Sequence, residues 1–207
     1  TEGNNNVAIG INSLTSNTTS TGNTAVGFKA LEANTDNGDN TAVGCEAMKA
    51  TTTGHSNTAV GALALDTNTT GCKNTSIGSL SLAGNTTADN NTAVGYQAML
   101  TNSTGNSTTA VGVTALHCQT TANNNVAVGF AAGRKTTTGA GNTTVGTNAG
   151  CNITTGSNNQ FFGDIAGTDP VRNTAAGDNE IVIGNNSNTS AFIKIDWTVT
   201  SDLRDKT

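Results

Sequence analysis

Hydrophobic and polar positions recur with one fixed period along most of the chain. A glycine that follows a small aliphatic residue, or Phe162 in the last case, returns ten times in equal 17-residue steps. The ten positions are Gly10, Gly27, Gly44, Gly61, Gly78, Gly95, Gly112, Gly129, Gly146 and Gly163. An unbroken period of this length is typical of a repeat protein, in which each repeat contacts its neighbours.

The repeat has apolar and small columns at fixed places around the glycine. Val or Ile precedes the glycine, Ala or Ser stands three places after it, and Leu or Met stands four places after it from Leu14 to Leu116. In the last three repeats this fourth place holds Gly133, Gly150 and Gly167. We expect each coil to hold about three apolar side chains. Helices are not expected, because Thr and Val alternate with Gly and Asn at no 3.6-residue period.

The pattern predicts an all-β fold, a parallel β-roll or β-solenoid of 17-residue coils over residues 1–167. At about 3.3 Å per residue, a coil can trace a flattened loop of two or so short strands joined by turns. Coils stacked about 4.8 Å apart pair each strand in parallel with its copy, so ten coils form a rod roughly 50 Å long. Thr and Asn can form hydrogen-bonded ladders along such a stack.

The period fails after Gly163. The next matching phrase, "EIVIG", ends at Gly184 after a 21-residue step, and this step contains the only proline, Pro170. Residues 168–190 are therefore predicted to be an irregular connection with a last divergent coil phrase. Residues 191–207 contain "AFIKIDWTVT", in which apolar and polar residues alternate, and this predicts a terminal strand with one buried face.

Composition limits what the chain can bind. The net charge is −5 and 11% of residues are charged, so neither a basic nucleic-acid surface nor the high charge of many disordered chains is present. No stretch approaches the roughly 20 apolar residues of a membrane span, so membrane insertion is not expected.

A thin core makes association of identical chains the expected source of further burial. With 34% hydrophobic and 3% aromatic residues, one coil buries little apolar surface against the entropy lost on ordering its backbone. Closed symmetry would cover the sides of the rod. The variable column after the glycine is the candidate seam, although a freely drifting surface column explains it equally well. Its members are Ile11, Phe28, Cys45, Ala62, Ser79, Tyr96, Val113, Phe130, Thr147 and Asp164.

The coil phrase resembles a known family. "NTAVGxxAL" is similar to the "NSVAIGxxA" coil of trimeric autotransporter adhesin heads. The resemblance covers roughly residues 4–167 and implies a left-handed β-roll in a homotrimer. The coil of that family is usually shorter than the coil of this chain.

The C-terminal "TSDLRDK" resembles the start of the intramolecular chaperone domain of endosialidase-type phage tailspikes and tail fibres. The matching positions are Ser201, Asp202, Arg204 and Lys206. In that family the chaperone assembles the trimer and is then removed by self-cleavage. The resemblance implies that Ser201 is the nucleophile and Lys206 the assisting base. A desolvated lysine amine with a lowered pKa can deprotonate a hydroxyl.

These resemblances lead to an expected function. The chain is predicted to be a structural and host-attachment segment of a viral trimeric fibre or spike, from a phage or an algal-type virus, exposed on the virion surface or outside the cell. Its expected partners are its own copies and a host cell-surface glycan or protein receptor. No enzymatic activity is expected apart from single-turnover self-cleavage.

Two other classes remain open. A bacterial surface adhesin head would use the same coil phrase. An ice-binding solenoid would use the Thr column that includes Thr24, Thr41 and Thr58, but such proteins usually present T-x-T, and here Val or Ile stands two places on.

Other residue types suggest little chemistry. Cys45, Cys72, Cys118 and Cys151 fall in four different columns, and His55 and His117 lack metal-ligand spacing, so no metal or cofactor is predicted. Several Asn-x-Ser/Thr sequons occur, as expected by chance in a chain rich in Asn and Thr. They include Asn17, Asn68, Asn85, Asn102, Asn106, Asn142 and Asn152.

Overall fold

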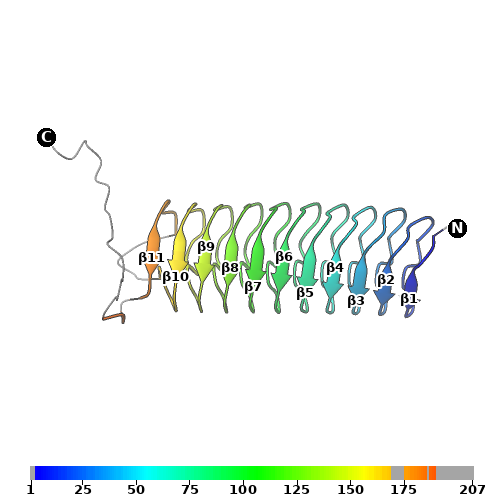
Figure 1. Cartoon of the computed structure of the whole chain (residues 1–207), viewed down its shortest axis with the longest axis horizontal. Helices are drawn as coiled ribbons and strands as arrows, with labels where there is room; N and C mark the ends of the chain where they lie inside the picture. The colour runs from blue at the N-terminus through cyan, green and yellow to red at the C-terminus, as the bar shows by residue number, and fades with distance from the viewer. Residues whose placement is uncertain (1–2, 169–174, 186, 190–207) are drawn as a thin grey trace.

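The computed structural model describes residues 3–168, 175–185 and 187–189, and in these residues the chain forms one parallel sheet without helices. The strands lie side by side in chain order and form a straight-sided rod (Figure 1). The strands are β1 (Val7–Ile9), β2 (Thr24–Val26), β3 (Thr41–Val43), β4 (Thr58–Val60), β5 (Thr75–Ile77), β6 (Thr92–Val94), β7 (Thr109–Val111), β8 (Val126–Val128), β9 (Thr143–Val145), β10 (Gln160–Phe162) and β11 (Ile181–Ile183).

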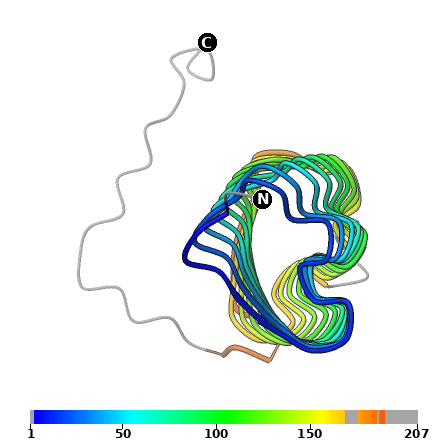
Figure 2. The ribbon, with the colours of Figure 1, turned by 90° about the vertical axis from the view of Figure 1, so that its right-hand side faces the viewer.

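Each strand pairs with its own copy in the next coil, as the period predicts. In the pairing of β2 with β3, Thr24 lies opposite Thr41 and Ala25 lies opposite Ala42, a shift of one full repeat. The all-β, parallel, 17-residue solenoid is therefore confirmed. Each coil carries one strand of three residues, not the two or so that were expected, and turns form the rest of the loop (Figure 2).

Close backbone approach explains the repeated glycine. At Gly95 the φ angle is +137°, and an added Cβ would lie 2.5 Å from the carbonyl oxygen of Gly112. Such a contact is impossible for any side chain, and only glycine adopts this φ without strain. The strand therefore ends at the residue before the glycine, and the backbone beyond it still forms hydrogen bonds with the next coil.

Hydrogen bonds between coils continue beyond the strands. The Leu65 N–H donates to the Ser81 oxygen over 3.0 Å, although Leu65 itself adopts a left-handed φ of 54°. Leu63 also has a positive φ, and its N–H donates to the Cys45 oxygen over 2.9 Å. The turns are thus held by the same stacking that holds the sheet, which offsets their backbone strain.

The apolar interior consists of three columns. These are the central residue of each strand, which is alanine in most coils, the Ala or Ser three places after the glycine, and the Leu or Met that follows it in most coils. Ala59, Ala64 and Leu65 represent one coil, and all three are fully buried. The aliphatic column before the glycine faces outward: Ile77 is 40% exposed and Ile9 is 60% exposed.

A ladder of buried asparagines lines the other side of the interior. The Asn74 backbone N–H donates to Asn57 Oδ1 over 2.9 Å, and Asn74 Nδ2 donates to the Ala88 oxygen over 2.8 Å. Asn91 repeats the pattern one coil later by donating to Asn74 Oδ1 over 2.9 Å. The predicted Asn ladder is confirmed, and it satisfies backbone groups that burial would otherwise leave without partners.

The coil around Gly112 departs from this ladder at two places. Thr108 replaces the ladder asparagine, and its Oγ1 lies 3.4 Å from the N–H of Asn125. In the same coil Gln119 replaces a second inward asparagine, and its longer side chain donates to Thr108 Oγ1 over 3.4 Å. Gln119 Oε1 also accepts from Asn125 Nδ2 over 2.9 Å. The longer glutamine thus occupies the space that the shorter threonine leaves.

The last coils exchange their leucine for larger side chains elsewhere. Around Gly150, an added Cβ would lie 2.9 Å from Ile153 Cδ1 and 3.0 Å from Phe161 Cδ2. Phe161 stands where other coils have the central alanine, and it is fully buried. Phe161 and Ile153 therefore occupy the space beside Gly150 and Gly167, where other coils carry Leu or Met.

The 21-residue step still ends in register. Phe161 lies opposite Val182 in the pairing of β10 with β11, so the "EIVIG" phrase within the predicted connection 168–190 adds a strand to the sheet. The Gln160 N–H donates to the Glu180 oxygen over 2.8 Å. The strand predicted within 191–207 lies outside the described residues.

Candidate interaction surface

One side of the rod presents a continuous outward surface of the sheet. We call it the sheet face and define it by the first and third residues of each strand together with the residue after each glycine. In β1 to β9, Thr or Val stands at the first place and Val or Ile at the third; β10 has Gln160 and Phe162 and β11 has Ile181 and Ile183. The strand alternates, so its central residue points inward between these two. Its large exposed apolar side chains are Val7, Ile9, Ile11, Phe28, Val60, Ile77, Tyr96, Val113, Val126, Val128, Phe130, Val145, Ile181 and Ile183.

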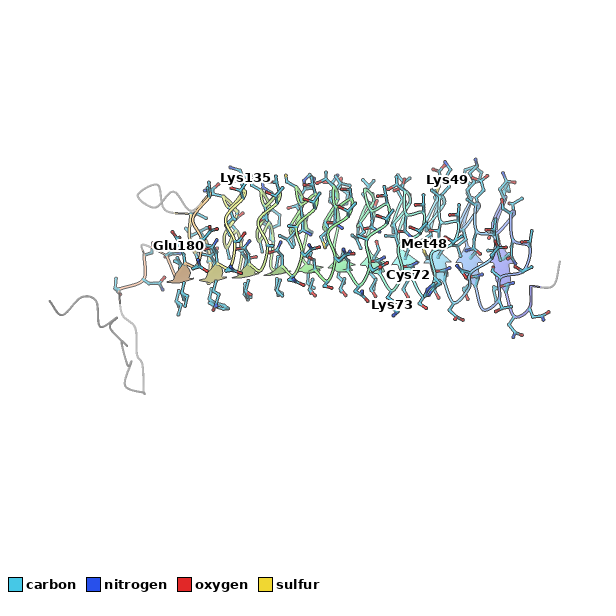
Figure 3. The ribbon with its side chains drawn as sticks, turned by 90° about the horizontal axis from the view of Figure 1, so that it is seen from above. Met48, Lys49, Cys72, Lys73, Lys135 and Glu180 are labelled. Carbon is cyan, nitrogen blue, oxygen red and sulfur yellow. The ribbon has the colours of Figure 1, made fainter. Side chains whose placement is uncertain are left out.

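The sheet face carries almost no charge. From Val7 to Thr147 none of its positions is Asp, Glu, Lys, Arg or His, and Asp164 is the first exception. Charged residues flank it in neighbouring columns. Figure 3 shows Lys49 and Lys135 along one long edge of the rod and Lys73 on the opposite edge, near the strands.

The charged edge forms short ion pairs. Lys29 Nζ lies 3.3 Å from Glu32 Oε1, and Lys49 Nζ lies 3.2 Å from Glu46 Oε2. These pairs are partly exposed and contribute little to stability.

The size of the sheet face matches that of a protein interface. Ten coils about 4.8 Å apart and five residues of about 3.3 Å each outline a strip of roughly 800 Å². Stable complexes bury about 800 Å² on each partner. A nearly uncharged strip of this size, with exposed Val, Ile, Phe and Tyr side chains between threonines, is the candidate surface for association.

The column that the sequence proposes as a seam forms one edge of this strip. Ile11 and Phe130 are 73% and 55% exposed, and Phe28, Tyr96 and Val113 are exposed as well. Sequence reasoning missed the aliphatic column beside it. The alternation in "TAV" could have revealed this column, since one fully buried residue between two outward ones is the period of a strand.

Two titratable groups outside the sheet face have shifted pKa values. Burial raises the pKa of the Asp66 carboxyl above its ordinary value of 3.8, and the nearby charge of Glu46 acts in the same direction. Burial lowers the pKa of His117, and the positive charge of Arg134 adds to this shift. Neither group lies within a cluster of described residues that suggests catalysis.

The remaining candidate residues are dispersed. Cys45 is exposed on the sheet face, and all four cysteines are free, in four separate columns. Among the described residues, no three His, Cys, Asp or Glu side chains gather where they could hold a metal ion. In the same part of the chain, no helix has the length and apolarity needed to cross a membrane.

The proposed cleavage residues Ser201, Asp202, Arg204 and Lys206 lie outside the described residues. Self-cleavage therefore stays a prediction from the sequence. The sheet face is the feature of the described chain that best fits a functional surface.

Comparison of the chain with protein-family models, with curated proteins and with solved structures finds no match. The described fold defines a class, the parallel β-solenoids with short coils. Function has to be argued from the surface of this solenoid.

Proposed function

We propose that the chain is a structural segment of a homotrimeric fibre or spike that attaches to a host surface. The observation that carries this proposal is the sheet face, an exposed, apolar and nearly uncharged strip that runs the length of the rod. A second copy of the chain is the partner that fits it, because an identical strip of identical spacing meets it without an unpaired charge.

Three copies would direct their sheet faces toward a common axis. Phe28, Tyr96 and Phe130 at the border of the strip would then pack between neighbouring chains, where aromatic residues contribute most to association. The charged edge with Lys49 and Lys135 would remain outside, in water. The number three follows from the resemblance of the coil phrase to trimeric adhesin heads.

The variable turns outside the sheet face would contact the host. Side chains at the charged edge change from coil to coil, as in Glu32, Lys49, Asp66 and Arg134, whereas the interior repeats. Loops on a rigid scaffold are the usual place for recognition. A cell-surface glycan or protein is the partner proposed for these turns.

Maturation by self-cleavage completes the proposal. Ser201 Oγ would attack the carbonyl carbon of the preceding residue, with Lys206 accepting the hydroxyl proton. The peptide C–N bond would break as the Ser201 nitrogen takes up a proton, and hydrolysis of the resulting ester by water would release an assembly domain. The test is to express the chain with any coding sequence that follows Thr207 and to measure its mass. Cleavage near Ser201 that disappears in Ser201→Ala supports the proposal, and a cut that persists in this variant refutes it.

Sedimentation equilibrium tests the assembly. We expect the mass of a trimer for the chain itself, and dissociation when Ile77→Glu and Tyr96→Glu place charges on the sheet face. Thr87→Glu and Thr104→Glu are matched controls on an exposed turn column, and they should leave the trimer intact. A monomeric parent chain refutes the trimer, and a trimer insensitive to the sheet-face charges refutes this interface.

Two other functions would give different results. A bacterial adhesin head would share the trimer and the sheet face, but its extended chain would not be cleaved near Ser201. Ice binding is favoured by one observation: Thr58 and Val60 point outward together from the same strand, giving two regular columns. Thermal hysteresis by a monomeric chain would support that function over the fibre.

A further inference from the structure

The interior asparagine ladders contain N-glycosylation sequons. Asn68, Asn85, Asn102 and Asn142 of the sequons noted above are buried, and Asn74 in "NTS" is buried as well. Each of the five has an exposed fraction of 0 or 1%. Five positions that the sequence marks for a bulky, hydrated modification are thus fully enclosed by the fold.

The atom that would carry the sugar is already bonded inside the solenoid. Asn68 Nδ2 donates to the Gly71 oxygen over 3.0 Å, and Asn85 Nδ2 donates to Asn68 Oδ1 over 2.9 Å. Asn142 Nδ2 donates to the Gly156 oxygen over 2.8 Å. Glycosylation joins this nitrogen to the anomeric carbon of an oligosaccharide, releases the lipid diphosphate that carried it and removes one amide proton. The product has neither the space nor the full set of donors that the ladder uses.

The ladder also closes too late to protect these residues during synthesis. Asn68 Oδ1 receives its hydrogen bond from Asn85, which is made 17 residues later. At about 5–20 residues per second, the partner follows after about 1–3 s. A transferase acting on the emerging chain would reach Asn68 before its coil can be covered.

We infer that N-linked glycosylation and this fold exclude each other at the five buried sequons, so that the chain folds only when it is made without exposure to an oligosaccharyl transferase. The inference rests on the interior of the solenoid and is independent of the proposed function. By contrast, Asn90 and Asn106 head sequons whose side chains are exposed, and a glycan there is compatible with the fold.

The test expresses the chain with a cleavable secretion signal in a eukaryotic host and, for comparison, in a cytosol without the transferase. Mass spectrometry reports the occupancy of each sequon, and protease resistance with far-UV circular dichroism reports folding. We expect the cytosolic chain to be resistant and the chains glycosylated at buried sequons to be digested. Resistant chains with glycans at Asn85 or Asn102 would overturn the inference, as would a secreted, folded chain with all five sequons unoccupied.

A matched variant removes the sequons and keeps the ladder. Thr70→Val, Thr87→Val and Thr104→Val alter exposed third residues of three sequons, and Ser76→Ala and Thr144→Ala introduce the residue that other coils carry. This variant should fold in the cytosol and regain protease resistance in the secretory route.

The control variant Asn90→Asp with Asn106→Asp removes exposed sequons and should leave the secreted chain unfolded. The inference is overturned if this control restores folding. It is also overturned if the five-site variant folds in the cytosol but stays protease-sensitive after secretion.

Discussion

A double-mutant cycle at Thr108 and Gln119 tests whether these two departures from the asparagine ladder compensate for each other. Gln119→Asn alone removes the acceptor that lies 2.9 Å from Asn125 Nδ2 and the donor that lies 3.4 Å from Thr108 Oγ1. Leaving a buried polar group without a partner costs about 1–3 kcal/mol. Thr108→Asn alone inserts a larger side chain against Gln119, and overpacking costs about 1–3 kcal/mol.

Together the two substitutions recreate the coil that precedes this one, in which Asn91 and Asn102 stand at the same places. We therefore expect the double variant to lie within about 1 kcal/mol of the parent chain, with a coupling energy of about 1–3 kcal/mol between the sites. Urea unfolding followed by circular dichroism gives the four free energies of unfolding, provided that the denaturant dependence stays constant.

The reverse exchange is the control. Asn91→Thr and Asn102→Gln should each destabilise the preceding coil, and the pair should recover most of the loss, because it reproduces the arrangement of Thr108 and Gln119. Additive losses in both cycles would show that the two residues act independently. The compensation argued from their hydrogen bonds would then be wrong.

Three further substitutions test the interior, the glycine column and a shifted pKa. Leu65→Ala, at a fully buried position, should lower the free energy of unfolding by about 2–5 kcal/mol. Leu63→Ala, at a partly exposed turn position, should lower it much less. Urea unfolding measures both free energies. Gly95→Ala should prevent the local stacking, because its Cβ would meet the backbone oxygen of Gly112. Gly22→Asn should cost less, because asparagine adopts a φ of 73° and its Cβ would meet only the side-chain oxygen Oδ1 of Asp39; proteolysis of the two variants distinguishes them. Burial raises the pKa of Asp66 in the folded chain, so protonation of this carboxyl stabilises the fold. This stabilisation is fully present below the ordinary pKa of 3.8 and is lost as the pH rises through the pKa of the folded chain. Asp66→Asn should therefore raise the melting temperature at pH 7, and this gain should shrink as the pH falls toward 3.8; an equal gain at both pH values would contradict the assignment.

The 17-residue period was sufficient to predict the parallel stack and its register. Each copy of the coil carries the same residues at the same places, so in-register pairing is the arrangement that aligns every glycine, alanine and asparagine at once. The strand count per coil was harder to predict. Turn residues such as Leu63 and Leu65 adopt positive φ angles that their side chains disfavour, and the stacked hydrogen bonds alone make these angles acceptable.

The orientation of the aliphatic column could not be predicted from the repeat. Hydrophobicity alone places Val60 inside, but the Leu or Met side chains reach the interior from the turn and leave room only for an alanine between the outward residues Thr58 and Val60. A local pattern cannot show this, because the competing side chains come from a different part of the coil.

The sequence by itself determined the coil length, the all-β class, the parallel order and the Asn ladders, since all of these follow from periodic identity. Only the tertiary structure decided which columns fill the tube and which form the sheet face. The reason is volume: the interior accepts one Leu or Met per coil, or Phe161 and Ile153 beside Gly150 and Gly167, and the Val or Ile before each glycine lies on the outside of the sheet.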